Sequence, residues 1–146
     1  MKYYTYDTST LISRKLSDFP GNFLFSSVVL FELTASAGDE KRRKLYEQLA
    51  RDYGQDNSLI VPNEEDWLMA SKVLFWLDQE RRRKGRGLAP RLKPGASQRM
   101  AMDALLAASA KRWEVTVITE NWDDFKAIQR YCKVKLVKAN DFFGKG

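Results

Sequence analysis

YYTYDTSTLI, residues 3–12, is the stretch that decides the fold. Its first half is a run of aromatic and β-branched residues, which favour strands, and it ends at Asp7. Its second half begins with three hydroxyl residues, which are typical of helix starts, and continues with Leu11 and Ile12. The stretch therefore predicts a strand followed directly by a helix, with an acidic side chain at the junction.

The same alternation of strand-like and helix-like segments continues along the chain, which favours an α/β sheet protein. Further strands are expected over residues 23–26, 59–61, 115–118 and 134–137. Helices are expected over residues 8–16, 27–35, 40–53, 100–112 and 123–131, and a longer one begins after the capping residues 63–66. Glycines and prolines in residues 85–95 predict a loop, which is the best candidate for a lid.

The apolar spacing within the helices predicts which side chains face the core. In the helix over residues 40–53, which we expect Gly54 to close, Leu45 and Leu49 are predicted to point inward. In the long helix Trp67 shares an apolar pattern with Ala70, Val73, Leu74 and Leu77. Trp67, Phe75 and Trp76 are interpreted as core side chains, with an interface role as the alternative.

Composition limits the chemistry, because the 146 residues contain no histidine and a single cysteine, Cys132. An imidazole base, a disulfide and a cysteine zinc cluster are therefore excluded. Carboxylate and hydroxyl oxygens remain as metal ligands, and they prefer Mg²⁺ or Mn²⁺. The length and the 44% hydrophobic content predict a single domain over residues 1–146. Neither a signal peptide nor a membrane span is recognisable, so we expect a cytoplasmic protein.

The charge of the chain favours a polyanionic partner. Lysine and arginine number 25 against 19 acidic residues, which gives a net charge of +6. The basic residues gather in two runs, residues 41–44 and 81–86. Either run alone is interpreted as a solvated helix face, whereas the two together favour contact with a nucleic-acid backbone.

Four acidic residues lie in segments that otherwise resemble buried core: Asp7, Glu32, Asp103 and Asp124. Because the carboxyl ends of parallel strands meet in one crevice, we expect the four to lie close together. Such a cluster repels itself unless a cation compensates, and a bound Mg²⁺ or Mn²⁺ can activate water against a phosphodiester. The hydroxyls of Ser9 and Thr119 are expected to orient ligands or water around it.

Each acid also has a structural interpretation that needs no metal. Asp7 is a candidate helix N-cap, and Asp103 is a candidate first-turn acid that interacts with the helix dipole. Glu32 has apolar or small helix neighbours, so its alternative is a partly exposed position at a helix edge. Asp124 can complete a capping box begun by Asn121, and Asp123 competes with it for the same role in the site.

The order of these residues resembles the PIN domain family, which includes VapC toxins of type II toxin–antitoxin pairs. The matching segments are DTSTLI at 7–12, SVVLFEL at 27–33, DALLAA at 103–108 and TENWDDF at 119–125. The resemblance implies a three-layer α/β/α sandwich with a central parallel sheet. It also implies RNA cleavage with Mg²⁺ or Mn²⁺ held by Asp7, Glu32, Asp103 and Asp124, a small cognate antitoxin and a homodimer. The basic, proline- and glycine-rich segment 81–98 departs from the family pattern.

Other classes of protein fit the sequence less well. A phosphatase of the haloacid dehalogenase type needs a second aspartate two residues after the first, where this chain has Ser9. The glycine-rich run of a P-loop is missing, and a receiver-like domain offers no role for Glu32. The remaining alternative is a non-catalytic RNA-binding or protein-interaction module whose acids cap helices.

Overall fold

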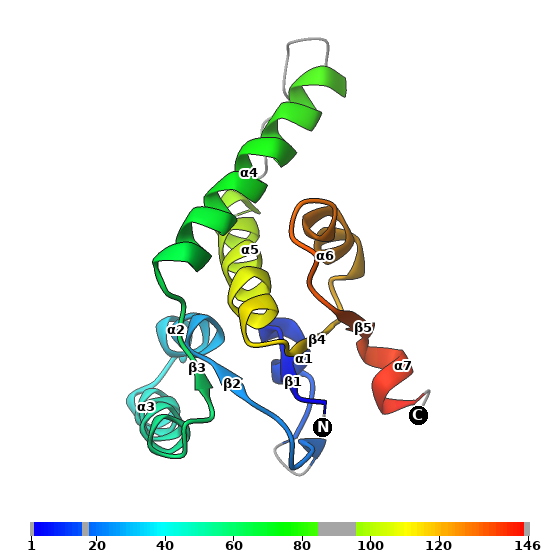
Figure 1. Cartoon of the computed structure of the whole chain (residues 1–146). Helices are drawn as coiled ribbons and strands as arrows, with labels where there is room; N and C mark the ends of the chain where they lie inside the picture. The colour runs from blue at the N-terminus through cyan, green and yellow to red at the C-terminus, as the bar shows by residue number, and fades with distance from the viewer. Residues whose placement is uncertain (1, 16–17, 85–95, 145–146) are drawn as a thin grey trace.

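The computed structural model describes residues 2–15, 18–84 and 96–144 (Figure 1). The strands are β1 (Tyr4–Tyr6), β2 (Phe25–Ser26), β3 (Leu59–Ile60), β4 (Thr116–Thr119) and β5 (Leu136–Lys138). The helices are α1 (Thr8–Ile12), α2 (Ser27–Ala35), α3 (Glu40–Gln55), α4 (Glu64–Lys84), α5 (Ala96–Arg112), α6 (Trp122–Gln129) and α7 (Ala139–Phe143). Each strand is thus followed by one or two helices from β1 to α7, which agrees with the predicted α/β pattern.

All strand pairs are parallel, and they form a three-stranded sheet β1-β4-β5 and a two-stranded sheet β2-β3. A parallel bridge between Tyr4 and Phe23 joins the two, so the strands run in the order β3-β2-β1-β4-β5. The chain moves outward from β1 through β2 to β3 and then crosses to β4 on the other side of β1. The crossover direction reverses between β1 and β4, which is the topological switch point where α/β sheets bind ligands.

Right-handed crossovers in opposite directions place their helices on opposite faces of the sheet. The connections from β1 to β3 carry α1, α2 and α3, whereas the connections from β3 to β5 carry α4, α5 and α6. Figure 1 shows α4 running alongside α5, which lies over the strands. The expected three-layer α/β/α sandwich with a central parallel sheet is therefore confirmed.

The core is one cluster of buried side chains between these layers. Val117 and Ile118 of β4 have no exposed surface, and neither have Tyr6 of β1 and Phe25 of β2. The rings of Tyr6, Phe23 and Phe25 pack edge-on or tilted with centroids 4.7 to 5.2 Å apart. The aromatic stretch at the N-terminus thus fixes β1, and with it the position of Asp7, in the centre of the fold.

Several predicted boundaries are wrong by a few residues. The first helix ends at Ile12 and not at residue 16, and α3 continues through Gly54 to Gln55. β2 contains only Phe25 and Ser26 of the predicted strand 23–26, while α7 is a helix that the apolar pattern did not reveal. The predicted loop over residues 85–95 lies outside the described residues.

Two helices expose single apolar side chains that the sequence pattern assigns to the core, Leu45 in α3 and Trp67 in α4. In α3 the half-buried positions are Tyr46, Leu49, Ala50 and Tyr53, an i, i+3, i+4, i+7 series from which Leu45 projects at 51% exposure. Leu49 packs inward as expected.

In α4 the buried residues are Asp66, Ala70 and Val73, so that Trp67 is 56% exposed. The core interpretation is also wrong for Phe75 and Trp76, which are 54% and 41% exposed. Of the described helices, none combines the length and the apolar character that a membrane span requires.

Candidate metal centre

Asp7 lies at the carboxyl end of β1 and is buried, with 1% of its surface exposed. Its Oδ1 accepts a hydrogen bond from the Thr10 amide at 3.1 Å, so that Asp7 is the N-cap of α1. Its Oδ2 accepts hydrogen bonds from the Thr119 hydroxyl at 2.6 Å and from the Ser9 hydroxyl at 3.4 Å. Burial raises the pKa of Asp7, and the hydrogen bonds from Thr10 and Thr119 partly offset the rise. Asp7 therefore caps a helix and also faces the switch point.

Hydroxyl groups fix the loop that follows β4 against α1. The Thr119 hydroxyl accepts the Asn121 amide at 2.8 Å while it donates to Asp7. The Thr10 hydroxyl accepts the Glu120 amide at 3.0 Å. Ser9 and Thr119, which were expected to orient the site, thus both contact Asp7, and Thr119 connects the ends of the neighbouring strands β1 and β4.

Glu32 projects from α2 toward the start of α1. Its Oε1 accepts a hydrogen bond from the Thr8 hydroxyl at 2.8 Å. Burial raises the pKa of Glu32, the Thr8 hydrogen bond lowers it, and the charge of Asp7 raises it further. The charge of Asp7 therefore reaches Glu32, although the two come from segments more than twenty residues apart in the sequence.

Asp103 lies in the interior of α5, which begins at Ala96, about one turn earlier than expected. The interpretation as a first-turn acid is therefore wrong, because no acidic residue occupies the first turn of α5. Burial raises the pKa of Asp103 to about 8, and the charges of Asp7, Glu32 and Asp124 add to the rise. The charges of the other three predicted acids thus all reach Asp103.

Asp124 is exposed in the first turn of α6. Asn121 is the N-cap of this helix but makes no side-chain capping hydrogen bond, so the capping box that would explain Asp124 is not formed. The charges that raise the pKa of Asp103 include that of Asp124. This acid therefore has no capping role to explain it, and its charge reaches Asp103.

Two residues at the site were missed by sequence reasoning. Thr8 was assigned only to the start of a helix, yet it holds Glu32. The positive charge of Arg99 lowers the pKa of both Asp103 and Glu32, so it opposes the repulsion among the acids. Arg99 precedes Asp103 by four residues, and this spacing on one helix face is the signal that points to it.

The four acids fit a hard divalent cation in donor type and in charge. Their ligand atoms are all oxygens, and burial together with the charges of the other three acids raises the pKa of Asp103, an effect that a cation would relieve. Their separations are wider than shared ligation requires, because no three acidic or cysteine side chains in the described ranges form a metal-holding group. A cation here would therefore need rotamer changes that draw the carboxylates together, and metal binding stays a prediction.

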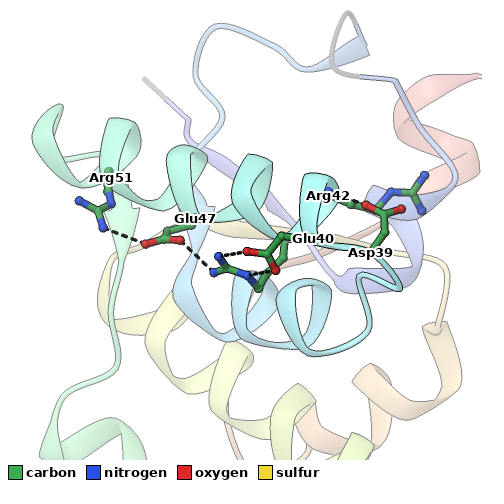
Figure 2. A network of polar contacts seen from close by, with 6 residues as sticks. Asp39, Glu40, Arg42, Glu47 and Arg51 are labelled. Carbon is green, nitrogen blue, oxygen red and sulfur yellow. Dashed lines mark hydrogen bonds and ion pairs between the residues drawn. The ribbon is translucent and has the colours of Figure 1, made fainter.

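In the first basic run Arg43 pairs with acids of its own helix. Figure 2 shows the Asp39–Arg51 segment, in which Arg43 donates to Glu40 at 2.7 Å and to Glu47 at 3.0 Å. Arg51 pairs with Glu47 at 2.8 Å. In the second run Arg81 and Arg82 pair with Asp78. The interpretation as a solvated helix face therefore holds for these arginines.

Comparisons with known proteins extend the fold assignment. The sequence matches no family model and no curated protein. A chain of the DNA-bound VapBC complex from Salmonella typhimurium has a TM-score of 0.57 at 17% identity, over 95% of this chain and 99% of that one. For FitAB bound to a DNA fragment the TM-score is 0.55 at 16% identity, over 98% and 97%. For VapBC-1 from nontypeable Haemophilus influenzae it is 0.54 at 20% identity, over 94% and 98%.

These similarities cover nearly the whole of each chain, and at such identities they show the fold. The chain has the α/β/α fold found in the VapBC and FitAB complexes. The resemblance to PIN domains is thus confirmed at the level of architecture.

Proposed function

We propose that this chain is a metal-dependent endoribonuclease and the VapC-like toxin of a type II toxin–antitoxin pair. The observation that carries the proposal is the arrangement of four carboxylates, from four different segments, around the switch point of a parallel sheet. Asp7 follows β1, Glu32 is on α2, Asp103 is on α5 and Asp124 opens α6. Such convergence is costly for the fold, and it is explained if the acids hold a cation that acts on a phosphodiester.

In this proposal Asp7, Glu32, Asp103 and Asp124 hold Mg²⁺ or Mn²⁺. When bound, the cation supplies an activated water and stabilises the charge that develops on the phosphodiester oxygens. The surrounding residues keep the carboxylates in place for it.

The hydroxyl of Thr119 orients Asp7 and that of Thr8 orients Glu32. Arg99 offsets part of the negative charge, and in this proposal it contacts an RNA phosphate near Asp103.

The proposed partners are RNA, a small cognate antitoxin and a second copy of the chain. The net charge of +6 supports an RNA substrate, which the protein would meet in the cytoplasm. The similarity to the VapBC and FitAB complexes supports an antitoxin. Trp67, Phe75 and Trp76 are exposed on α4, which supports an interface role for these aromatics in a homodimer.

The test is incubation of the purified chain with total RNA in Mg²⁺ or Mn²⁺, with EDTA as the control, followed by mapping of the new RNA ends. The proposal predicts discrete cleavage sites that disappear in EDTA. Intact RNA, bound with a strong salt dependence in every buffer, would instead support a non-catalytic RNA-binding module. That result would contradict the assignment as an enzyme.

A further inference from the structure

A tryptophan and two lysines come together beside the acidic site. Trp122 opens α6 and is partly exposed, whereas Phe125 and Ile128 of the same helix are fully buried. The ammonium group of Lys138, at the end of β5, lies 5.2 Å from the centre of the Trp122 ring, and that of Lys126 lies 5.5 Å from it. The core therefore does not require this indole, and two cations from different elements approach it.

The indole borders a surface cavity of about 360 Å³. Its walls are Thr119, Glu120, Trp122, Lys138, Ala139 and Asn140. This volume lies within the range of small-molecule sites, roughly 300 to 1,000 Å³. Thr119 is shared with the acidic site, because its hydroxyl donates to Asp7 at 2.6 Å. The cavity therefore adjoins the place where the proposed cleavage occurs.

The chemistry of the walls matches one nucleotide. An indole can stack on any base, and the two ammonium groups that lie over the Trp122 ring can move aside on their flexible stems to contact the flanking phosphates. The side-chain amide of Asn140 offers both a donor and an acceptor to a base edge. Glu120 is the acidic group on the walls, and its carboxylate accepts a hydrogen bond from Ser13 at 2.8 Å.

Basic side chains continue from this cavity along α6. A second cavity of about 320 Å³ is lined by Lys126, Gln129, Arg130, Lys133 and Val134. Lys126 therefore connects the second cavity with Trp122, because its ammonium group also lies over the Trp122 ring. A strand of RNA that leaves the acidic site past Trp122 and Lys126 would meet two further cationic side chains, Lys133 and Arg130, the second of which pairs with Glu80.

We propose that Trp122, Lys126 and Lys138 form a subsite that stacks one base of single-stranded RNA and binds its flanking phosphates next to the cleaved bond. The inference rests on the proposed ribonuclease function, whose substrate it specifies as unpaired RNA. Stacking requires an unpaired base, because the bases of a duplex have no free face.

The test measures binding of a short fluorescein-labelled single-stranded RNA to the full chain in EDTA, so that no cleavage is needed. Trp122→Ala should weaken binding about tenfold, within the range for the loss of one base–aromatic stack. Trp122→Phe should keep most of the affinity and lose the RNA-induced quenching of indole fluorescence. Trp113→Ala is the matched control, because Trp113 is 37% exposed and lies before the amino-terminal end of β4, whereas Trp122 follows its carboxyl end.

A second readout does not depend on the folding of the alanine variant. Lys138→Gln should reduce the slope of log Kd against log salt by about 0.7, the value for one phosphate contact on a single strand. Lys72→Gln, on the exposed surface of α4, should leave the slope unchanged. Wild-type affinity in Trp122→Ala, or an unchanged slope in Lys138→Gln, would overturn the subsite.

The outcomes also separate this inference from the proposed function. RNA that binds through Trp122 but stays intact in Mn²⁺ would support the subsite and contradict the nuclease. If the wild-type chain cleaves RNA in Mn²⁺ and its Trp122→Ala variant binds RNA normally, the result would support the nuclease and contradict the subsite.

Discussion

Asp103→Asn should raise the Tm of the metal-free protein at pH 8 and at the same time remove RNA cleavage. The pKa of Asp103 lies near 8 because burial and the charges of Asp7, Glu32 and Asp124 disfavour its ionised form. Each pKa unit corresponds to about 1.4 kcal/mol, so the rise from 3.8 to about 8 corresponds to about 6 kcal/mol. Because the folded site relaxes around the charge, a neutral amide should stabilise the fold by only part of this, about 2 to 4 kcal/mol. For a chain of this length the Tm should rise by about 5 °C or more.

Cleavage should fall by more than about 100-fold in the same variant, because the loss of a ligand exceeds the usual effect of losing an outer-shell partner. The increase in stability and the loss of activity therefore have a common origin in the four acids. Asp123→Asn is the matched control, since Asp123 is an exposed neighbour of Asp124. Asp123→Asn should leave both the Tm and the rate of RNA cleavage close to the wild-type values.

The pH dependence of stability follows from the same raised pKa. Between the ordinary pKa of 3.8 and the folded value of about 8, the folded chain binds a proton at Asp103 that the unfolded chain has released. The free energy of unfolding should therefore decrease as the pH rises through this window, and the decrease should be smaller in Asp103→Asn. If Asp103→Asn melts at or below the wild-type temperature at pH 8, the charges of the neighbouring acids do not destabilise the fold through Asp103.

Asp66→Ala should lower the free energy of unfolding by about 2 to 4 kcal/mol, somewhat less than a fully buried ion pair because Arg112 is 35% exposed. The Asp66 side chain is 4% exposed and accepts two hydrogen bonds from Arg112 Nε, at 3.1 and 2.9 Å. Arg112 also donates to the Val61 carbonyl at 2.9 Å. The pair thus joins the start of α4, the end of α5 and the residue after β3. Urea unfolding followed by circular dichroism measures the loss.

Asp78→Ala is the control for this prediction, because it removes an aspartate of the same helix that also pairs with arginine. Asp78 contacts Arg81 and Arg82 near the surface, with 36% of its side chain exposed. Such pairs contribute at most about 1 kcal/mol, so the urea midpoint should change little. If Asp66→Ala and Asp78→Ala lower the free energy of unfolding equally, the buried pair does not stabilise the position of α5, which carries Asp103, more than a surface pair does.

The sequence predicts the arrangement of the acids better than their local contacts. The aromatic strand that ends at Asp7 and the apolar strand that ends near Thr119 specify parallel strands with polar groups at one edge, and this depends on local patterns alone. The hydrogen bond between Thr8 and Glu32 joins side chains 24 residues apart, which no local pattern encodes. The start of α5 was placed too late because residues 96–99 contain one apolar side chain, so the helical period becomes visible only at Met100.

The orientation of α4 illustrates the same limit. Apolar spacing assigns Trp67 to the core, whereas Asp66 takes the buried position because Arg112 and the amide of Asn63 satisfy its oxygens. The rest of the predicted face is confirmed, because Ala70 and Val73 are buried and Leu74 and Leu77 pack against the core. The difference is confined to Trp67, whose neighbour Asp66 is held in the buried position by a long-range ion pair that no local pattern encodes.

The most direct test of the account is a titration of the purified chain with Mn²⁺, in which the electron paramagnetic resonance signal reports free Mn²⁺. The four carboxylates should give saturable binding in the wild type and in Asp123→Asn, and binding should be lost in Asp103→Asn. A wild-type chain that takes up no Mn²⁺, or an Asp103→Asn variant that binds it as tightly as the wild type, would contradict a shared cation site at Asp7, Glu32, Asp103 and Asp124.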